Sequence, residues 1–141
     1  GVSNDPSEQK YLENVGTLKS IISQVRTIPA GDSVGYGRRF MAEKETKIAT
    51  IPIGYADGIA RLWGNEVGFV TIKNQKAPIV GSVCMDMLMV NVSEIDCKEG
   101  DPVILFGQQP RVTEIAKTIG TIPYEILTSI SQRVKRVFYK E

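Results

Sequence analysis

Residues 67–83 read VGFVTIKNQKAPIVGSV, and this stretch decides the fold class. Two apolar runs rich in β-branched residues, 67–72 and 77–83, flank a polar tetrapeptide. This pattern predicts the two strands of a hairpin with the polar residues at its tip. Similar short apolar runs occur at residues 15–28, 47–53, 88–92 and 102–106. Many short strands with few helices predict a mostly β domain, either a small β-barrel or two closely packed sheets.

Helical patterns occur only near the C-terminus. Thr113 is predicted to cap one short helix, and Gly120 is predicted to end it. Pro123 fits the first position of a second short helix. Residues 134–139 are predicted to form a final strand.

The chain has 141 residues, which is typical of one domain with a real hydrophobic core. Its 17 basic and 16 acidic residues nearly cancel, so net charge gives no reason to expect nucleic acid or a membrane as a partner. No apolar run approaches the ~20 residues of a membrane span. Residues 1–14 are polar and are predicted to be an arm or linker that leads into a domain over residues 15–141.

The chain holds two cysteines, Cys84 and Cys97, and no histidine. The cysteines form no CxxC pair, so no metal site is expected. Two reduced thiols in a cytoplasmic protein are expected, and a disulfide is the alternative.

Tyr36 lies between two glycines in the run DSVGYG, residues 32–37. Flanking glycines allow the backbone to bend and other groups to approach the ring. In a chain without histidine, Tyr36 is also one of the few side chains that can transfer protons. On a short strand Arg38 shares its face, where a cation favours the phenolate. A structural tyrosine is the alternative.

Four further segments are candidates for chemistry, each beside a simpler structural interpretation. The GYADG loop with Tyr55 is either a functional loop or a plain turn. The CMDM segment at 84–87 is either part of a site or an apolar strand. Tyr124 lies where a helix N-terminus favours an anion, or packs on a strand. The basic run at 133–137 attracts phosphate or protects an edge strand.

The order and spacing of these motifs resemble the C-terminal domain of alanine racemases. The resemblance rests on VGYG at 34–37, IPIGYADG at 51–58, APIVG at 77–81, VCMD at 83–86 and PYE at 123–125. It runs from about residue 15 to the end of the chain. GYADG and CMD are specific in combination.

This resemblance implies a small β-barrel-like C-terminal domain that follows an N-terminal (β/α)₈ barrel outside the chain. Residues 1–14 would be the arm that leaves that barrel. Members of the family form homodimers and interconvert L- and D-alanine for peptidoglycan synthesis. Their cofactor, pyridoxal 5′-phosphate, is attached to a lysine of the barrel. The chain alone is therefore expected to be inactive.

The resemblance also implies a role for five residues. Tyr36 matches the second catalytic base, which acts in the active site of the partner subunit. Met85 matches the residue whose backbone N–H contacts the substrate carboxylate, and Asp86 lies beside it in the wall of the site. Tyr55 matches a tyrosine that lines the substrate entrance. Tyr124 matches a residue that hydrogen-bonds the cofactor phosphate.

The chain departs from the family pattern at two places. Ser82 stands where the family usually has an arginine, near the substrate entrance. Arg38 and Arg39 stand where the family has small and aromatic residues. Two other functions remain open: a related racemase acting on another amino acid, and a non-catalytic β-barrel module that binds nucleic acid or peptide through the basic tail.

Overall fold

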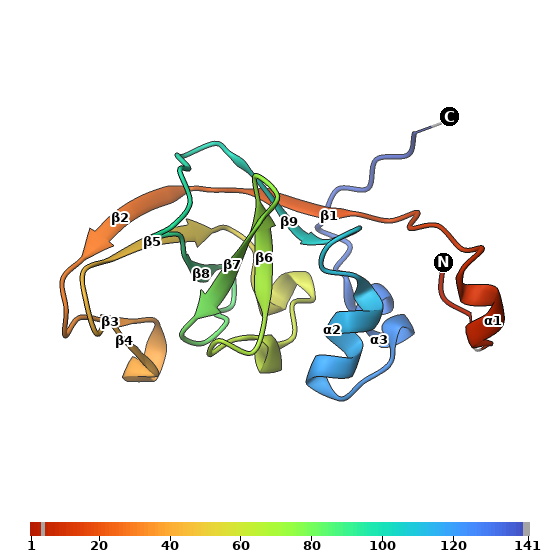
Figure 1. Cartoon of the computed structure of the whole chain (residues 1–141), viewed down its shortest axis with the longest axis horizontal. Coiled ribbons are helices and arrows are strands. Elements are labelled where there is room, and N and C mark those ends of the chain that lie inside the picture. The colour runs from red at the N-terminus through yellow and green to blue at the C-terminus, as the bar shows by residue number, and fades with distance from the viewer. Residues whose placement is uncertain (4, 140–141) are drawn as a thin grey trace.

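The computed structural model describes residues 1–3 and 5–139, and a seven-stranded sheet organises them (Figure 1). The strand order is β1-β9-β6-β7-β8-β5-β2, and every neighbouring pair is antiparallel. The strands are β1 (Leu18–Ile21), β2 (Gln24–Ile28), β5 (Thr46–Ile51), β6 (Phe69–Ile72), β7 (Gln75–Val80), β8 (Leu88–Asn91) and β9 (Pro102–Phe106). The predicted mostly β class and the predicted hairpin, now β6–β7, are confirmed, but the hairpin tip is Lys73 and Asn74 alone, because Gln75 and Lys76 pair with Ile72 and Thr71.

The two edges of this sheet come from one continuous run of chain. The Ile22 N–H donates to the Asp101 carbonyl at 3.0 Å, beside β9, and the Ser23 N–H donates to the Thr50 carbonyl of β5 at 2.9 Å. The run therefore pairs with β9 first and with β5 afterwards, which closes the sheet into a barrel-like shape. The single strand predicted over 15–28 was wrong in this respect, because the change of partners divides it into β1 and β2.

Alternating side chains divide the interior into two cores. Ala49, Ile79 and Val90 belong to the large core, together with the apolar faces of the C-terminal helices. Their neighbours along the strands point to the opposite face of the sheet. There they form what we call the small core: Ile28, Val34, Ala42, Ile48, Val80, Cys84 and Met89. Part of the sheet is thus buried on both faces.

A separate two-stranded hairpin, β3 (Ser33–Val34) and β4 (Phe40–Met41), packs on the small core through Val34 and Phe40. Figure 1 shows this hairpin at one end of the domain and the C-terminal helices toward the other. The buried Cys84 and Cys97 are free thiols in different cores.

Three α-helices complete the described chain: α1 (Pro6–Gln9), α2 (Val112–Ile119) and α3 (Pro123–Ser129). The two short helices near the C-terminus are as predicted, and Gly120 ends α2 with a φ of 76°. Thr113 is not the cap of α2. The cap is Arg111, whose N–H donates to the Glu114 carboxylate at 2.9 Å, and the helix therefore begins two residues earlier than predicted. Within the described residues, no helix is long and apolar enough to cross a membrane.

The chain after α3 does not form the strand predicted over residues 134–139. The Arg136 guanidinium donates to the carbonyls of Ile130, Ser131 and Val134 at 2.9–3.1 Å. These bonds stabilise the turn at residues 132–134, and residues 135–139 that follow it belong to no strand.

Candidate functional site

Tyr36 lies in a single 3₁₀ turn, Tyr36–Arg38, between β3 and β4. Gly35 and Gly37 have φ values of 74° and 75°, in the left-handed region that glycine adopts without strain. These two conformations reverse the chain within the hairpin, so the predicted strand through Tyr36 was wrong. The side chain is 79% exposed. Within the described part of the chain its hydroxyl makes no hydrogen bond.

The predicted arrangement of Arg38 and Tyr36 on one face of a strand is not found. The alternation of a strand does not hold here, because Gly37 and Arg38 have positive φ values of 75° and 50°, and Arg38 does not line the hollow that Tyr36 borders. The cation that shares a shallow hollow of about 440 Å³ with Tyr36 is Arg26, from β2. Cys84 and Met87 line the same hollow. Sequence reasoning missed Arg26, because its position depends on the pairing of β2 with β5.

Tyr55 belongs to another 3₁₀ turn, Tyr55–Asp57, which lies directly on the segment carrying Met85. The Tyr55 N–H donates to the Cys84 carbonyl at 2.9 Å, and the Ala56 N–H donates to the Met85 carbonyl at 3.0 Å. Gly54 is required for this approach: a Cβ atom there would lie 2.3 Å from the Cys84 carbonyl oxygen. The GYADG and CMD motifs therefore specify two segments that pack backbone to backbone.

Met85 and Asp86 are the central residues of a turn over 84–87, closed by the Cys84 N–H donating to the Met87 carbonyl at 2.9 Å. Met85 is 53% exposed. No acceptor for its backbone N–H is found among residues 1–3 and 5–139. The Met85 N–H is thus a backbone donor that stays unbonded within the described residues.

Asp57 and Asp86 share one arginine, which sequence reasoning interpreted as protection of an edge strand. Arg133 Nε donates to Asp57 Oδ1 at 2.6 Å, and Arg133 Nη2 donates to Asp86 Oδ1 at 2.5 Å. Asp57 is buried, and its other oxygen accepts the Gly54 N–H at 2.8 Å. Charge spacing in the sequence gave no signal for a pair 76 residues apart.

The electrostatics of this cluster favour charged forms. Burial by itself raises the pKa of Asp57, but the hydrogen bonds from Arg133 and from the Gly54 N–H outweigh it and lower that pKa below the ordinary value. The bonds to Asp57 and to Asp86 raise the pKa of Arg133 further above its usual range. Arg133 is therefore charged and bonded to two carboxylates.

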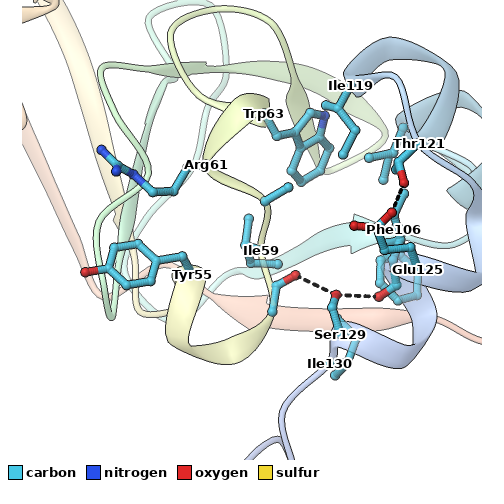
Figure 2. Close-up of a pocket in the computed structure, with 14 residues that line it drawn as sticks. Tyr55, Ile59, Arg61, Trp63, Phe106, Ile119, Thr121, Glu125, Ser129 and Ile130 are labelled. Carbon is cyan, nitrogen blue, oxygen red and sulfur yellow. Dashed lines mark hydrogen bonds between the residues drawn. The ribbon is translucent and has the colours of Figure 1, made fainter.

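Tyr55 also borders a cavity of about 340 Å³ between its own turn and helices α2 and α3. Figure 2 shows Tyr55 and Arg61 on one side and Glu125 and Ser129 on the other. The Arg61 guanidinium lies 5.9 Å from the centre of the Tyr55 ring, a cation–π contact that sequence reasoning missed. The cavity walls are mostly apolar, and the Tyr55 hydroxyl points away from it (Figure 2).

Tyr124 lies in the first turn of α3, as predicted, and is 49% exposed. Its hydroxyl donates to the Val2 carbonyl at a long 3.4 Å. It is not part of the cavity, although its neighbour Glu125 is. Within the described residues, Tyr124 is the one predicted site residue that lies apart from the others.

Backbone packing brings the remaining four together. A Cβ atom on Gly81 would lie 2.7 Å from the Val34 carbonyl oxygen, so the Tyr36 hairpin rests on the segment that leads to the 84–87 turn. The buried Ser82 belongs to that segment. Tyr36 and Tyr55 therefore lie on either side of the turn that contains Met85 and Asp86. In the part of the chain that the structure describes, no group of three or more carboxylate or thiol side chains could hold a metal ion.

These features define a class: a mostly β domain that presents exposed tyrosines and a free backbone donor around a surface turn. The family model for "Alanine racemase, C-terminal domain" matches residues 15–138, and the chain belongs to this family.

Relatives and solved structures agree with this assignment. An alanine racemase of Helicobacter pylori (strain J99) is 43% identical over 136 residues, which cover 94% of this chain and 36% of the relative. The structure of alanine racemase from D-cycloserine-producing Streptomyces lavendulae matches with a TM-score of 0.92 at 34% identity, over 100% of this chain and 39% of that one. The Bartonella henselae alanine racemase with covalently bound pyridoxal phosphate matches with a TM-score of 0.83 at 39% identity, over 87% and 34%. The chain thus spans about a third of the length of these proteins.

Proposed function

We propose that this chain is the C-terminal domain of a pyridoxal-phosphate-dependent alanine racemase, and that Tyr36 is one of two catalytic bases. The observation that carries the proposal is the setting of Tyr36. It is 79% exposed, its hydroxyl has no partner among the described residues, and a turn anchored on the small core holds it. A rigid turn that holds a phenol out toward solvent favours a partner group outside this chain.

Racemisation removes the Cα proton of an amino acid on one face and returns a proton on the opposite face. One base cannot easily serve both faces, so two groups in fixed positions are needed. Tyr36 supplies its phenolic oxygen as the acceptor and donor on one face. The second base is a lysine outside this chain, and Tyr36 acts in the active site of the partner subunit of a homodimer.

The other residues bind and orient the substrate. The free Met85 N–H donates to the alanine carboxylate, a charge-assisted bond that is stronger than a neutral one. Asp86 forms the adjacent wall of the site. Tyr55 lines the entrance for substrate, with the Arg61 guanidinium 5.9 Å from the centre of its ring.

The cofactor is pyridoxal 5′-phosphate, which withdraws electrons from Cα when bound and so makes the Cα proton acidic. Tyr124 fits a role toward its phosphate: the hydroxyl is half-exposed, and its present bond to the Val2 carbonyl is long at 3.4 Å. Such a hydroxyl can turn to donate to a phosphate oxygen.

The rest of the enzyme lies outside the chain. Residues 1–14 lead from an N-terminal (β/α)₈ barrel that carries the cofactor lysine, and residues 15–141 form the C-terminal domain. The chain alone is therefore inactive. The whole protein is cytoplasmic and supplies D-alanine for peptidoglycan. The match over about a third of its relatives' length supports this division.

The test compares wild type with Tyr36→Phe in the full-length protein, following alanine optical rotation from each enantiomer and uptake of solvent deuterium at Cα. Loss of an acid–base group typically costs 10²- to 10⁴-fold in rate. We expect a loss of this size, with deuterium uptake from one enantiomer reduced more than from the other. Small and equal losses in both directions would show that Tyr36 is structural. Activity on another amino acid in place of alanine would favour a related racemase instead.

A further inference from the structure

Arg133 connects three segments of the candidate site, and we call Arg133 with Asp57 and Asp86 the Arg133 clasp. Its guanidinium spans from the chain after α3 to the Tyr55 turn through Asp57, and to the 84–87 turn through Asp86. A planar guanidinium holds two acceptors at a fixed relative angle, which a lysine ammonium does not.

The Asp57 side of the clasp is fixed. Its carboxylate accepts the Gly54 N–H at 2.8 Å, and its carbonyl accepts the Ser131 N–H at 3.0 Å. Gly58, with a φ of 103°, lies so close to the chain after α3 that a Cβ atom there would be 2.4 Å from the Ser129 carbonyl oxygen. The Tyr55 turn is therefore packed between two backbones.

The Asp86 side of the clasp, in contrast, is exposed to solvent. The Asp86 side chain is 56% exposed, and Arg133 is its partner. Ion pairs this exposed contribute little to the free energy of unfolding. A contact that adds little stability can still restrict where a turn lies, and this one acts on the residue next to the free Met85 N–H.

We infer that Arg133 is a positioning residue for substrate binding: it holds the 84–87 turn against the Tyr55 turn so that the Met85 N–H is aimed at the substrate carboxylate. This inference rests on the proposed function. Arg133 does not touch the reacting atoms. Without the clasp, the turn keeps its backbone bonds to the Tyr55 turn but loses the restraint at Asp86.

The test uses the full-length protein with Arg133→Met and Arg133→Lys, and Lys135→Met as the matched control. Lys135 lies on the same segment, is exposed and makes no hydrogen bond or ion pair among the described residues. The carboxylate contact exists in both the ground and transition states, so its loss raises KM rather than lowering kcat. For Arg133→Met we expect KM for alanine to rise about tenfold, the loss of one aimed bond to a charged group, with kcat changed less than about threefold.

Two comparisons then separate positioning from a general structural role. Arg133→Lys reaches one carboxylate and is expected to recover part of the KM loss, and Lys135→Met is expected to leave KM unchanged. Acetate, a carboxylate without an amino group, is expected to inhibit Arg133→Met less strongly, with its inhibition constant rising in proportion to KM. If Arg133→Met leaves KM unchanged, or if Lys135→Met raises it equally, the inference is overturned.

Hydrogen exchange gives a readout that does not need activity. The amides of residues 84–87 are expected to exchange several-fold faster in Arg133→Met, while those of β6 and β7 do not change. Unchanged exchange at 84–87 overturns the clasp whether or not the protein racemises alanine. If wild type does not racemise alanine, the proposed function fails, and faster exchange at 84–87 still identifies Arg133 as the residue that holds the turn.

Discussion

The hairpin that carries Tyr36 and the loop that carries Tyr55 both expose a tyrosine beside the 84–87 turn, yet different interactions hold them. The hairpin packs its apolar side chains on the small core and its backbone against Gly81, and the Tyr36 hydroxyl makes no hydrogen bond within the described residues. The loop is held by backbone hydrogen bonds, by glycines in close contact and by the buried Asp57 carboxylate.

This difference matches the different roles that we propose for the hairpin and for the loop. A proton-transferring tyrosine needs a free hydroxyl, so its support must come from apolar contacts beneath the turn rather than from hydrogen bonds to the ring. A substrate-binding loop needs backbone groups in fixed positions, which charge pairs and backbone contacts provide. The predictions below separate the two kinds of support.

Gly54→Ala should have the largest effect on stability. The new Cβ atom would lie 2.3 Å from the Cys84 carbonyl oxygen, a backbone atom that cannot move away easily. Such overpacking costs about 3 kcal/mol of unfolding free energy, measured by denaturant titration. Gly16→Ala is the control, because nothing lies within 4 Å of a Cβ atom there, and it should change stability by less than about 0.5 kcal/mol. Equal effects of the two changes would mean that the Tyr55 loop is not in close backbone contact.

Much of this arrangement could be predicted from the sequence. Alternating apolar runs predicted the strands, and Gly120 and Pro123 predicted where helices end and begin. The motif resemblance selected Tyr36, Tyr55 and Met85, and the structure places these around one turn. The predictions that were wrong concern features that tertiary contacts determine. The strand through Tyr36 was wrong because flanking glycines adopt positive φ, which residue type permits but does not dictate.

Arg133 is the clearest case of information that is absent from local sequence. In a run of alternating basic residues it looks like edge protection, and only the folded chain brings it to Asp57 and Asp86. Arg26 and Arg61 were missed for the same reason: the strand pairing and the loop packing that place them are not local. Spacing along the chain predicts which residues share an element, but not which elements meet.

Val34→Ala should act on the hairpin. Val34 is fully buried in the small core, and removing its two methyl groups leaves a cavity that costs about 2 kcal/mol. The loss should be local, with faster hydrogen exchange over residues 33–41 and lower racemase activity in the full-length protein. Val137→Ala is the control, since Val137 is 57% exposed and should tolerate the change. If exchange over 33–41 does not increase, apolar packing is not what holds Tyr36.

Asp57→Asn should have the smallest effect, and it should depend on pH. Hydrogen bonds outweigh burial and lower the pKa of Asp57 in the folded state, so its stabilising contribution is fully present above the unfolded pKa of about 3.9 and is lost as pH falls through the folded value. Asparagine keeps one of the two acceptor oxygens and loses the other together with the charge, so about 1 kcal/mol should be lost at pH 7. Denaturant titrations at pH 7 and pH 3 should show this difference shrinking in acid, whereas the Val34→Ala difference should stay constant because no titrating group is removed. If the Asp57→Asn difference is instead the same at both pH values, the Asp57 charge plays no part in holding the Tyr55 loop. The loop and the Tyr36 hairpin would then be held by the same kinds of interaction.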